Sequence, residues 1–115
     1  MHIPDTPLEL LKGTLDVLIL KTLSRGPLHG YGISRWIRQT TGEEFRIEEG
    51  ALYPALRRLE KKGLLAAEWG QTETGRQAKF YELTDAGRAE FEKSLGAWHR
   101  YVAAMARVLG SPAHG

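Results

Sequence analysis

Cysteine is absent from the 115-residue chain, which excludes a disulfide framework, a thiolate zinc site and a cysteine nucleophile. Histidine is scarce, and the four histidines lie far apart, without metal-ligand spacing: His2, His29, His99 and His114. No nucleophile stands in a recognisable pattern with a base. The sequence therefore predicts a protein that is not an enzyme and that needs no metal and no cofactor.

Long apolar runs and a targeting signal are also missing. Residues 1–7 lack the basic start of a secretory signal. The most apolar run, residues 15–20, is interrupted by Asp16 and is far too short to span a bilayer. We therefore expect a cytoplasmic protein with no membrane association.

The chain has almost no net charge, because 16 Lys and Arg are balanced by 14 Asp and Glu, which leaves a net charge of +2. That balance is too slight to indicate a polyanionic partner. The length and the 42% hydrophobic content are those of one folded domain with a modest core. Within residues 50–80, however, Lys and Arg outnumber Asp and Glu by six to three.

That basic region contains a predicted amphipathic helix, which begins near Gly50 and ends at Gly63. Its apolar stripe is Leu52, Leu56 and Leu59, and its other side carries Gly50, Pro54, Arg57, Arg58 and Lys61. With this start, Pro54 would lie close to the first turn, where a proline costs less. A helix of this kind suits the DNA major groove, although solvated surface helices share the pattern.

Elements on both sides of this helix complete a recognisable order. A Thr6-Pro7 start with Glu9 predicts a first helix that runs to about residue 23, and a second helix is expected over residues 30–40. Residues 64–69 and 78–83 read as two strands joined by a loop. The hairpin face expected to pack on the helices comprises Leu65, Trp69, Tyr81 and Leu83. We predict a mainly α fold with a small β-hairpin (α+β), a winged helix-turn-helix.

A last helix is predicted from the Thr84-Asp85 cap to about residue 109. Its large apolar residues are spaced as a heptad seam: Phe91, Leu95, Trp98, Val102, Met105 and Leu109. The seam could pack within the chain or pair with a second copy, and both remain open here. The predicted division is a DNA-binding domain over residues 1–83, a dimerisation helix over 84–110 and a disordered tail over 111–115.

Four blocks in this order resemble the PadR-type transcriptional regulators. They are LLKGTLDVLILKTLS (10–24), LHGYGI (28–33), GALYPALRRLEKKGLL (50–65) and KFYELTDAGR (79–88). The short final helix is similar to that of the compact subfamily, which includes multidrug-binding regulators. The resemblance implies a homodimer that binds a palindromic operator in double-stranded DNA, usually as a repressor, and releases it when a small molecule binds. A winged helix used only for protein interaction is the alternative.

The resemblance also assigns roles to residues of this chain. The positions that it places at DNA are Tyr53, Pro54, Arg57, Arg58 and Lys61 in the third helix, Arg76 and Lys79 in the hairpin, and His29 and Tyr31 in the second helix. His29 and Tyr31 could equally support the third helix by packing. Trp98, with Leu95 and Val102, stands where some compact members bind flat aromatic compounds, and the whole heptad seam would form the dimer interface.

Overall fold

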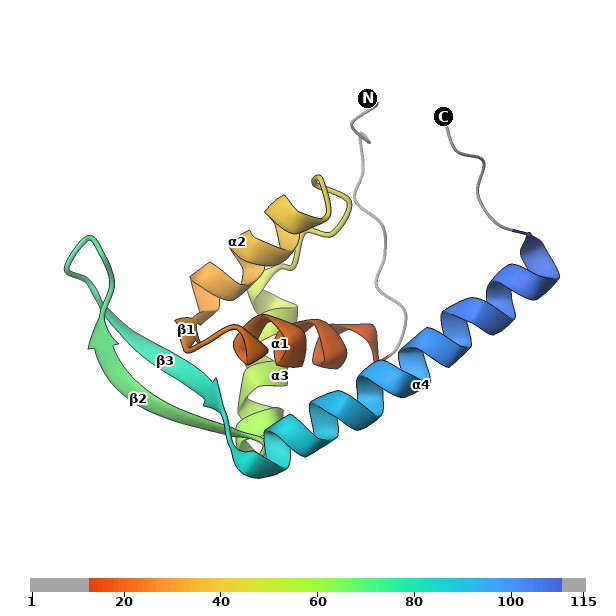
Figure 1. Cartoon of the computed structure of the whole chain (residues 1–115). Helices are drawn as coiled ribbons and strands as arrows, with labels where there is room; N and C mark the ends of the chain where they lie inside the picture. The colour runs from red at the N-terminus through yellow and green to blue at the C-terminus, as the bar shows by residue number, and fades with distance from the viewer. Residues whose placement is uncertain (1–12, 111–115) are drawn as a thin grey trace.

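The computed structural model describes residues 13–110 as four α-helices and a small antiparallel sheet (Figure 1). In chain order these are α1 (Thr14–Ser24), β1 (Leu28–His29), α2 (Gly30–Thr40), α3 (Glu49–Lys61), β2 (Leu65–Gln71), β3 (Gln77–Leu83) and α4 (Asp85–Leu109). The predicted α+β class, with three helices before a hairpin and one after it, is confirmed. The predicted tail over residues 111–115 lies outside the described residues.

The first helix begins later than predicted. Gly13 caps α1 with a left-handed backbone at φ +84°, a conformation that a right-handed helix cannot contain. A single helix running through residue 13 is therefore wrong, while its predicted start at Thr6 lies outside the described residues. The predicted end is confirmed, because Gly26, at φ +139°, follows directly on the cap residue Arg25.

The predicted bounds of α2 are confirmed, and those of α3 differ by one residue at its start. Pro54 lies five positions after Glu49, the first residue of α3, and so falls in the second turn rather than the first. Its ring nitrogen has no hydrogen to donate to the carbonyl of Gly50. Gly63, at φ +79°, then turns the chain out of the helix toward β2.

The sheet has the order β1-β3-β2. The β2–β3 hairpin runs from the pair Leu65–Leu83 to the pair Gln71–Gln77, so its strands are longer and its tip shorter than predicted. We call residues 72–76 the wing tip. Thr72 N–H closes it by donating to the carbonyl oxygen of Arg76 at 2.8 Å. Strand β1 was not predicted, because two residues are too few to show an alternating pattern.

The core lies where all three helices of the helix-turn-helix meet the inner end of the hairpin. Its buried side chains are Ile19, Leu20, Leu23, Ile33, Ile37, Leu52, Ala55, Leu56, Leu59, Leu65, Tyr81, Leu83 and Phe91. Three of the four predicted hairpin residues are among them. Trp69 is not, since 69% of its surface is exposed, and its predicted burial is wrong. The hairpin extends beyond the helices that would have covered this side chain (Figure 1).

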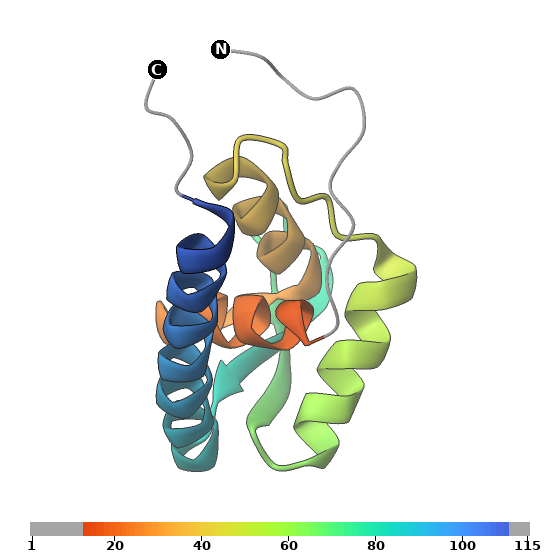
Figure 2. The ribbon, with the colours of Figure 1, turned by 90° about the vertical axis from the view of Figure 1, so that its right-hand side faces the viewer.

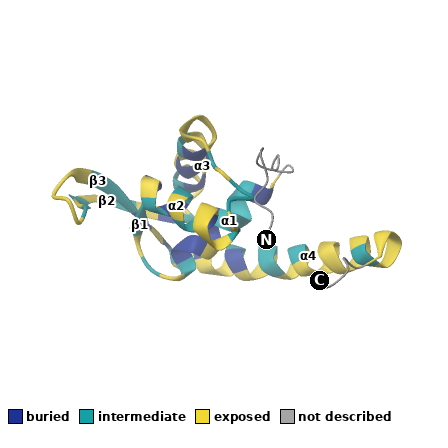
Figure 3. Cartoon of the chain, turned by 90° about the horizontal axis from the view of Figure 1, so that it is seen from above, coloured by how far each residue is buried: buried dark blue, intermediate teal, exposed yellow. Residues whose placement is uncertain are grey.

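Helix α4 is fixed to the domain at its first turn. The Thr84 hydroxyl accepts a hydrogen bond from Gly87 N–H at 3.0 Å and donates to the carbonyl oxygen of Gly63 at 2.6 Å. A methyl group on Gly87 would lie 2.0 Å from the Leu64 carbonyl oxygen, so only glycine allows this approach. The second half of α4 then leaves the body and is largely exposed (Figure 3). Helices α3 and α4 lie on opposite sides of α1 (Figure 2).

Candidate nucleic-acid interface

Helix α3 separates its residues into a buried and an exposed side. Successive residues turn by about 100°, so Leu52, Ala55, Leu56 and Leu59 form one stripe, and all four are buried. Directly opposite lie Gly50, Pro54, Arg57 and Lys61, all exposed. We call these four residues the outer stripe of α3. It is an uninterrupted helical surface with two cations and no acidic side chain.

Tyr53 borders the outer stripe on the side that faces α2. Its side chain is half-buried, and a Cβ atom added to Gly30 would lie 2.8 Å from its Cε1 atom. The absence of a side chain at the start of α2 therefore makes room for the Tyr53 ring. Tyr53 packs α3 against α2, and its contact with DNA bases stays a prediction.

Arg58 borders the outer stripe on the opposite side, where it meets α1. Its two terminal nitrogens donate to the two carboxylate oxygens of Asp16 at 2.7 and 2.8 Å. These hydrogen bonds, together with the charge of Asp16, raise the pKa of Arg58 above its ordinary value. The guanidinium group that the sequence placed at DNA therefore cross-links α3 to α1 in this structure.

Lys79 links the hairpin to α3. Its Nζ atom lies 3.1 Å from Oε1 of Glu60 and 5.6 Å from the centre of the Tyr81 ring. Burial raises the pKa of the Tyr81 hydroxyl, and the nearby charge of Lys79 opposes that effect. Arg76 is exposed in the wing tip. The structure thus separates the predicted basic pair, with Arg76 at the wing tip and Lys79 in contact with α3.

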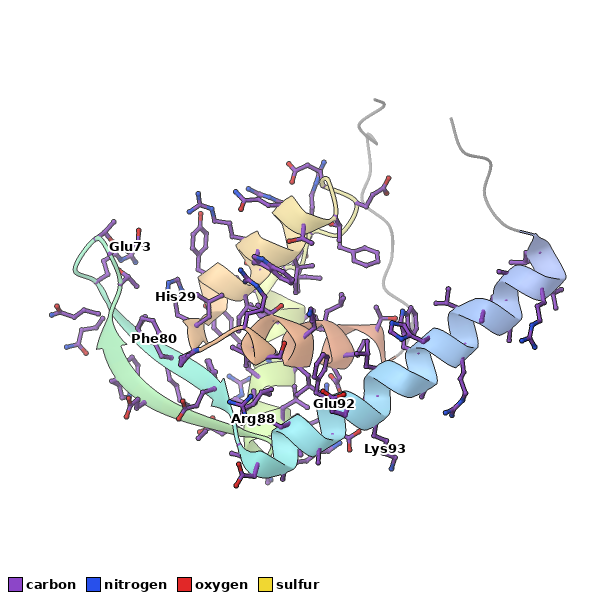
Figure 4. All side chains as sticks on the ribbon, viewed as in Figure 1. His29, Glu73, Phe80, Arg88, Glu92 and Lys93 are labelled. Atoms are coloured by element: carbon purple, nitrogen blue, oxygen red, sulfur yellow. The ribbon has the colours of Figure 1, made fainter. Side chains whose placement is uncertain are left out.

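His29 and Tyr31 stack at the start of α2 with their ring centres 6.4 Å apart, but His29 is half-buried and Tyr31 is exposed. Nδ1 of His29 accepts a hydrogen bond from Gly32 N–H at 3.1 Å, so this histidine caps α2. The His29 and Phe80 rings form a T-shaped pair with their centres 5.2 Å apart. Figure 4 labels both side chains, which lie next to each other. Tyr31 is exposed. The geometry supports packing for His29 and leaves Tyr31 accessible.

Sequence reasoning missed a group of arginines on α2 and the connector that leads to α3. A shallow hollow of about 70 Å³ is lined by Tyr31, Ser34, Arg35, Arg38, Arg46 and Ile47. Four of these are spaced 3, 1 and 3 residues apart on α2, a spacing that puts them on one helix face and could have revealed them. Arg38 is paired with Glu43 at 3.0 Å, so the hollow is less positive than three arginines alone would make it.

A sequence profile provides the deciding observation on identity. Residues 19–93, from within α1 to within α4, match the transcriptional regulator PadR-like family. The chain belongs to this family. The predicted family is thereby confirmed, and the winged helix-turn-helix is the DNA-binding fold of a PadR-like regulator.

Individual relatives are similar to this chain in sequence and in fold. This PadR-like regulator is 32% identical to the transcriptional regulator Rv3488 of Mycobacterium tuberculosis over 92% of each chain. Its fold matches the structure of smu.1704 from Streptococcus mutans with a TM-score of 0.75, at 31% identity, over 97% of this chain and 100% of that one.

The negative transcriptional regulator PadR of Bacillus subtilis is 30% identical over 70% of this chain and 44% of its own length. Its structure in complex with operator DNA matches this fold with a TM-score of 0.63, at 30% identity, over 70% of this chain and 46% of that one.

The second half of α4 in this PadR-like regulator exposes a broad apolar face. Its exposed members are Tyr101, Val102, Met105, Val108 and Leu109, with the half-buried Trp98 stacked on Tyr101 at 5.5 Å between ring centres. We call these six residues the apolar face of α4. Phe91, predicted to be in a dimer interface, is only 7% exposed and packs in the core of its own chain, so its part in an interface stays a prediction. Leu95 also packs against this core.

The described part of the chain holds neither a cluster of metal-ligating side chains nor a membrane-spanning helix. Within residues 13–110, no three His, Cys, Asp or Glu side chains gather in a way that could hold a metal ion. None of the helices in this range combines the length and the apolar character needed to cross a membrane.

Proposed function

We propose that this PadR-like regulator binds a palindromic operator as a homodimer and represses transcription from it. The observation that carries the proposal is the outer stripe of α3, a fully exposed helical surface with Arg57 and Lys61 and without a carboxylate. One α-helix fits the width of the major groove, and cations close to phosphates release counterions and so strengthen binding.

The structure refines the role that we assign to each predicted DNA-binding residue. We place Pro54, Arg57 and Lys61 in the groove, with Tyr53 beside them at base edges. Arg76 and the exposed Tyr31 would contact the flanking backbone. The residues that already have partners within the chain would hold α3 in place and reach DNA only secondarily: His29, Arg58 and Lys79.

Dimerisation through the apolar face of α4 would bring two copies of α3 to one operator. Large apolar side chains that stay exposed together on a helix favour a protein partner. Since α3 and α4 lie on opposite sides of α1, pairing through α4 leaves the outer stripe uncovered (Figure 2). A twofold axis would then match the symmetry of a palindromic site, with half-sites about 34 Å apart. In this arrangement residues 1–83 bind DNA and residues 84–110 pair the subunits.

A selection from random duplex DNA with the full-length protein tests the proposal. A duplex recovered in this way should lose affinity when Arg57 is replaced by Ala, and the slope of log K against log salt should fall by about two, one phosphate contact in each subunit. Arg88→Ala is the matched control, because Arg88 is an exposed arginine in the first turns of α4, outside both α3 and the wing tip. An unchanged slope in Arg57→Ala would remove α3 from the interface.

A small-molecule effector is a second candidate, favoured by the stacked pair of Trp98 and Tyr101. Two parallel aromatic rings on an exposed helix face offer a surface for a planar aromatic ligand, with Leu95 and Val102 beside it. Such a ligand should quench tryptophan fluorescence and release the operator, and Trp98→Ala should abolish both effects. A broad panel of planar compounds without any quenching would argue against this candidate.

The alternative is a winged helix that serves only as a protein-interaction module. It predicts that no duplex is retained even at low salt, where phosphate contacts are strongest. Our proposal instead implies a protein that works in the cytoplasm.

A further inference from the structure

Trp69 is the most exposed of the tryptophan, tyrosine and phenylalanine side chains in the described part of the chain. It lies in β2, and 69% of its surface is exposed. A single exposed apolar residue needs no explanation, but tryptophan is rarely left in water to this extent because it buries more area than any other side chain when it finds a partner. Its position in the hairpin indicates what that partner is.

Trp69 points to the side of the sheet that carries α3. Side chains alternate along a strand, so Trp69 shares a face with Leu65 and Ala67, which pack on the helices. Its cross-strand partner is Lys79, whose Nζ atom reaches Glu60 of α3 at 3.1 Å. Trp69 therefore lies on the hairpin face next to α3, in the corner that the outer stripe of α3 forms with the wing tip.

The charges around this angle are those of a DNA-binding surface. Arg57 and Lys61 lie on one side of it and Arg76 lies at the wing tip. The acidic residues of the two strands, Glu68 and Glu82, alternate to the opposite face of the sheet. Glu60 is neutralised by Lys79. Glu73 in the wing tip is the acid that remains nearby.

We propose that Trp69 packs against the sugar–phosphate backbone at the border of the major groove that α3 enters. The flat face of the indole would cover a deoxyribose, and its Nε1–H, which can only donate, would bond to a phosphate oxygen. Backbone contacts fix the position of a protein on DNA without reading sequence. Trp69 is therefore a positioning residue, which sets how deeply α3 sits in the groove. This inference rests on the DNA binding proposed above.

Fluorine NMR of the protein labelled with 5-fluorotryptophan tests the contact directly. The chain has three tryptophans, and the Trp69→Phe variant identifies the resonance of Trp69. Adding the selected duplex should shift or broaden this resonance. The resonance of Trp36 is the internal control, since that ring lies beneath Arg25 of the α1 cap, 4.4 Å from its guanidinium carbon, and should move little.

Binding measurements with variants distinguish an uncharged contact from a charged one, because they give both the Kd and its dependence on salt. Trp69→Ala should raise the Kd for the selected duplex by about tenfold or more, as expected when a tryptophan anchor is truncated. The salt slope should stay unchanged, in contrast to Arg57→Ala, because the indole carries no charge. Trp69→Phe keeps an aromatic face but loses the N–H, so its Kd should lie between that of the parent protein and that of Trp69→Ala. Because Trp69 is exposed, thermal unfolding of both variants should match that of the parent protein.

The outcomes are separable. If the parent protein retains no duplex, the proposed function fails and this inference falls with it. If the parent binds but the Trp69 resonance stays in place and Trp69→Ala binds equally well, only the inference is overturned. If Trp69→Ala changes the sedimentation of the protein without changing its DNA affinity, Trp69 contacts another protein chain and the inference is wrong as well.

Discussion

Helices α3 and α4 both combine apolar and polar residues, yet they place the large apolar ones very differently. Every leucine of α3 is buried within the chain, and the surface left over is polar and basic. In α4 only the first turns bury their large apolar side chains, with Phe91 in the core. The apolar face farther along the helix remains exposed. The two helices therefore present different chemistry to the outside.

This difference teaches which kind of partner each helix is suited to. A helix whose apolar side is already buried can gain little from another hydrophobic surface, so its exposed side is available for a charged ligand such as DNA. A helix that still exposes valine, methionine and leucine gains most by covering them with protein. The four predictions that follow test this contrast, beginning with the largest expected effect.

The close packing of the first turn of α4 on the domain should contribute strongly to the free energy of unfolding. Gly87→Ala forces a methyl group onto the Leu64 carbonyl oxygen, which is backbone and cannot move aside easily. We expect a loss of about 3 kcal/mol in the free energy of unfolding, at the upper end for an overpacked site. Urea denaturation measures it. If the variant is as stable as the parent, the close approach of α4 to the α3–β2 turn does not exist in solution.

The apolar face of α4 should control association and not folding. Met105→Glu puts a charge in the proposed interface twice per dimer, and we expect the dimer dissociation constant to rise about 100-fold or more. Stability of the separated subunit should hardly change, because Met105 is 42% exposed in it. Sedimentation at a series of concentrations measures the first quantity and thermal unfolding the second.

Ala103→Glu is the matched control for Met105→Glu. Ala103 is exposed and lies about 160° around α4 from Met105, away from the apolar face. It should leave the dissociation constant unchanged. Equal weakening by both variants would mean that added charge, and not the apolar face, drives the separation.

Local signals in the sequence were enough to predict most element boundaries. Thr84 caps the start of α4 and Gly63 follows the end of α3, and the structure confirms both boundaries. Gly13 was overlooked because a glycine within an apolar pattern can either stay in a helix or break it, and spacing alone does not decide.

Contacts between distant segments could not be predicted in the same way. Arg58 and Asp16 are 42 residues apart, and their pairing depends on how α1 crosses α3. Trp69 follows the alternation that predicted it to be buried, but its exposure depends on where the helices end above the sheet. The alternation therefore predicted the correct face of the strand for Trp69 but the wrong extent of burial. The outer stripe of α3 was predictable because its spacing is local.

Gly96 tests whether the middle of α4 is constrained by anything within the chain. No atom lies within 4 Å of the Cβ that an alanine would add there. Gly96→Ala should therefore stabilise the protein by up to about 1 kcal/mol, through helix propensity alone. Thermal unfolding measures the gain, with Gly110→Ala as the control, because the left-handed φ of +88° at Gly110 makes alanine unfavourable. A loss of stability in Gly96→Ala would indicate that another chain approaches α4 closely at this point.

The smallest effect should come from Arg58, the cation of α3 that is already paired. Its side chain is about half exposed, so solvent screening limits the ion pair with Asp16, and a double-mutant cycle with Arg58→Ala and Asp16→Ala should give a coupling of about 0.5 kcal/mol. For DNA binding, Arg58→Ala should change the salt slope less than Arg57→Ala does. The two arginines are adjacent and chemically identical, so each is the matched control for the other. Equal slopes in the two variants would show that Arg58 leaves Asp16 for a phosphate when DNA binds.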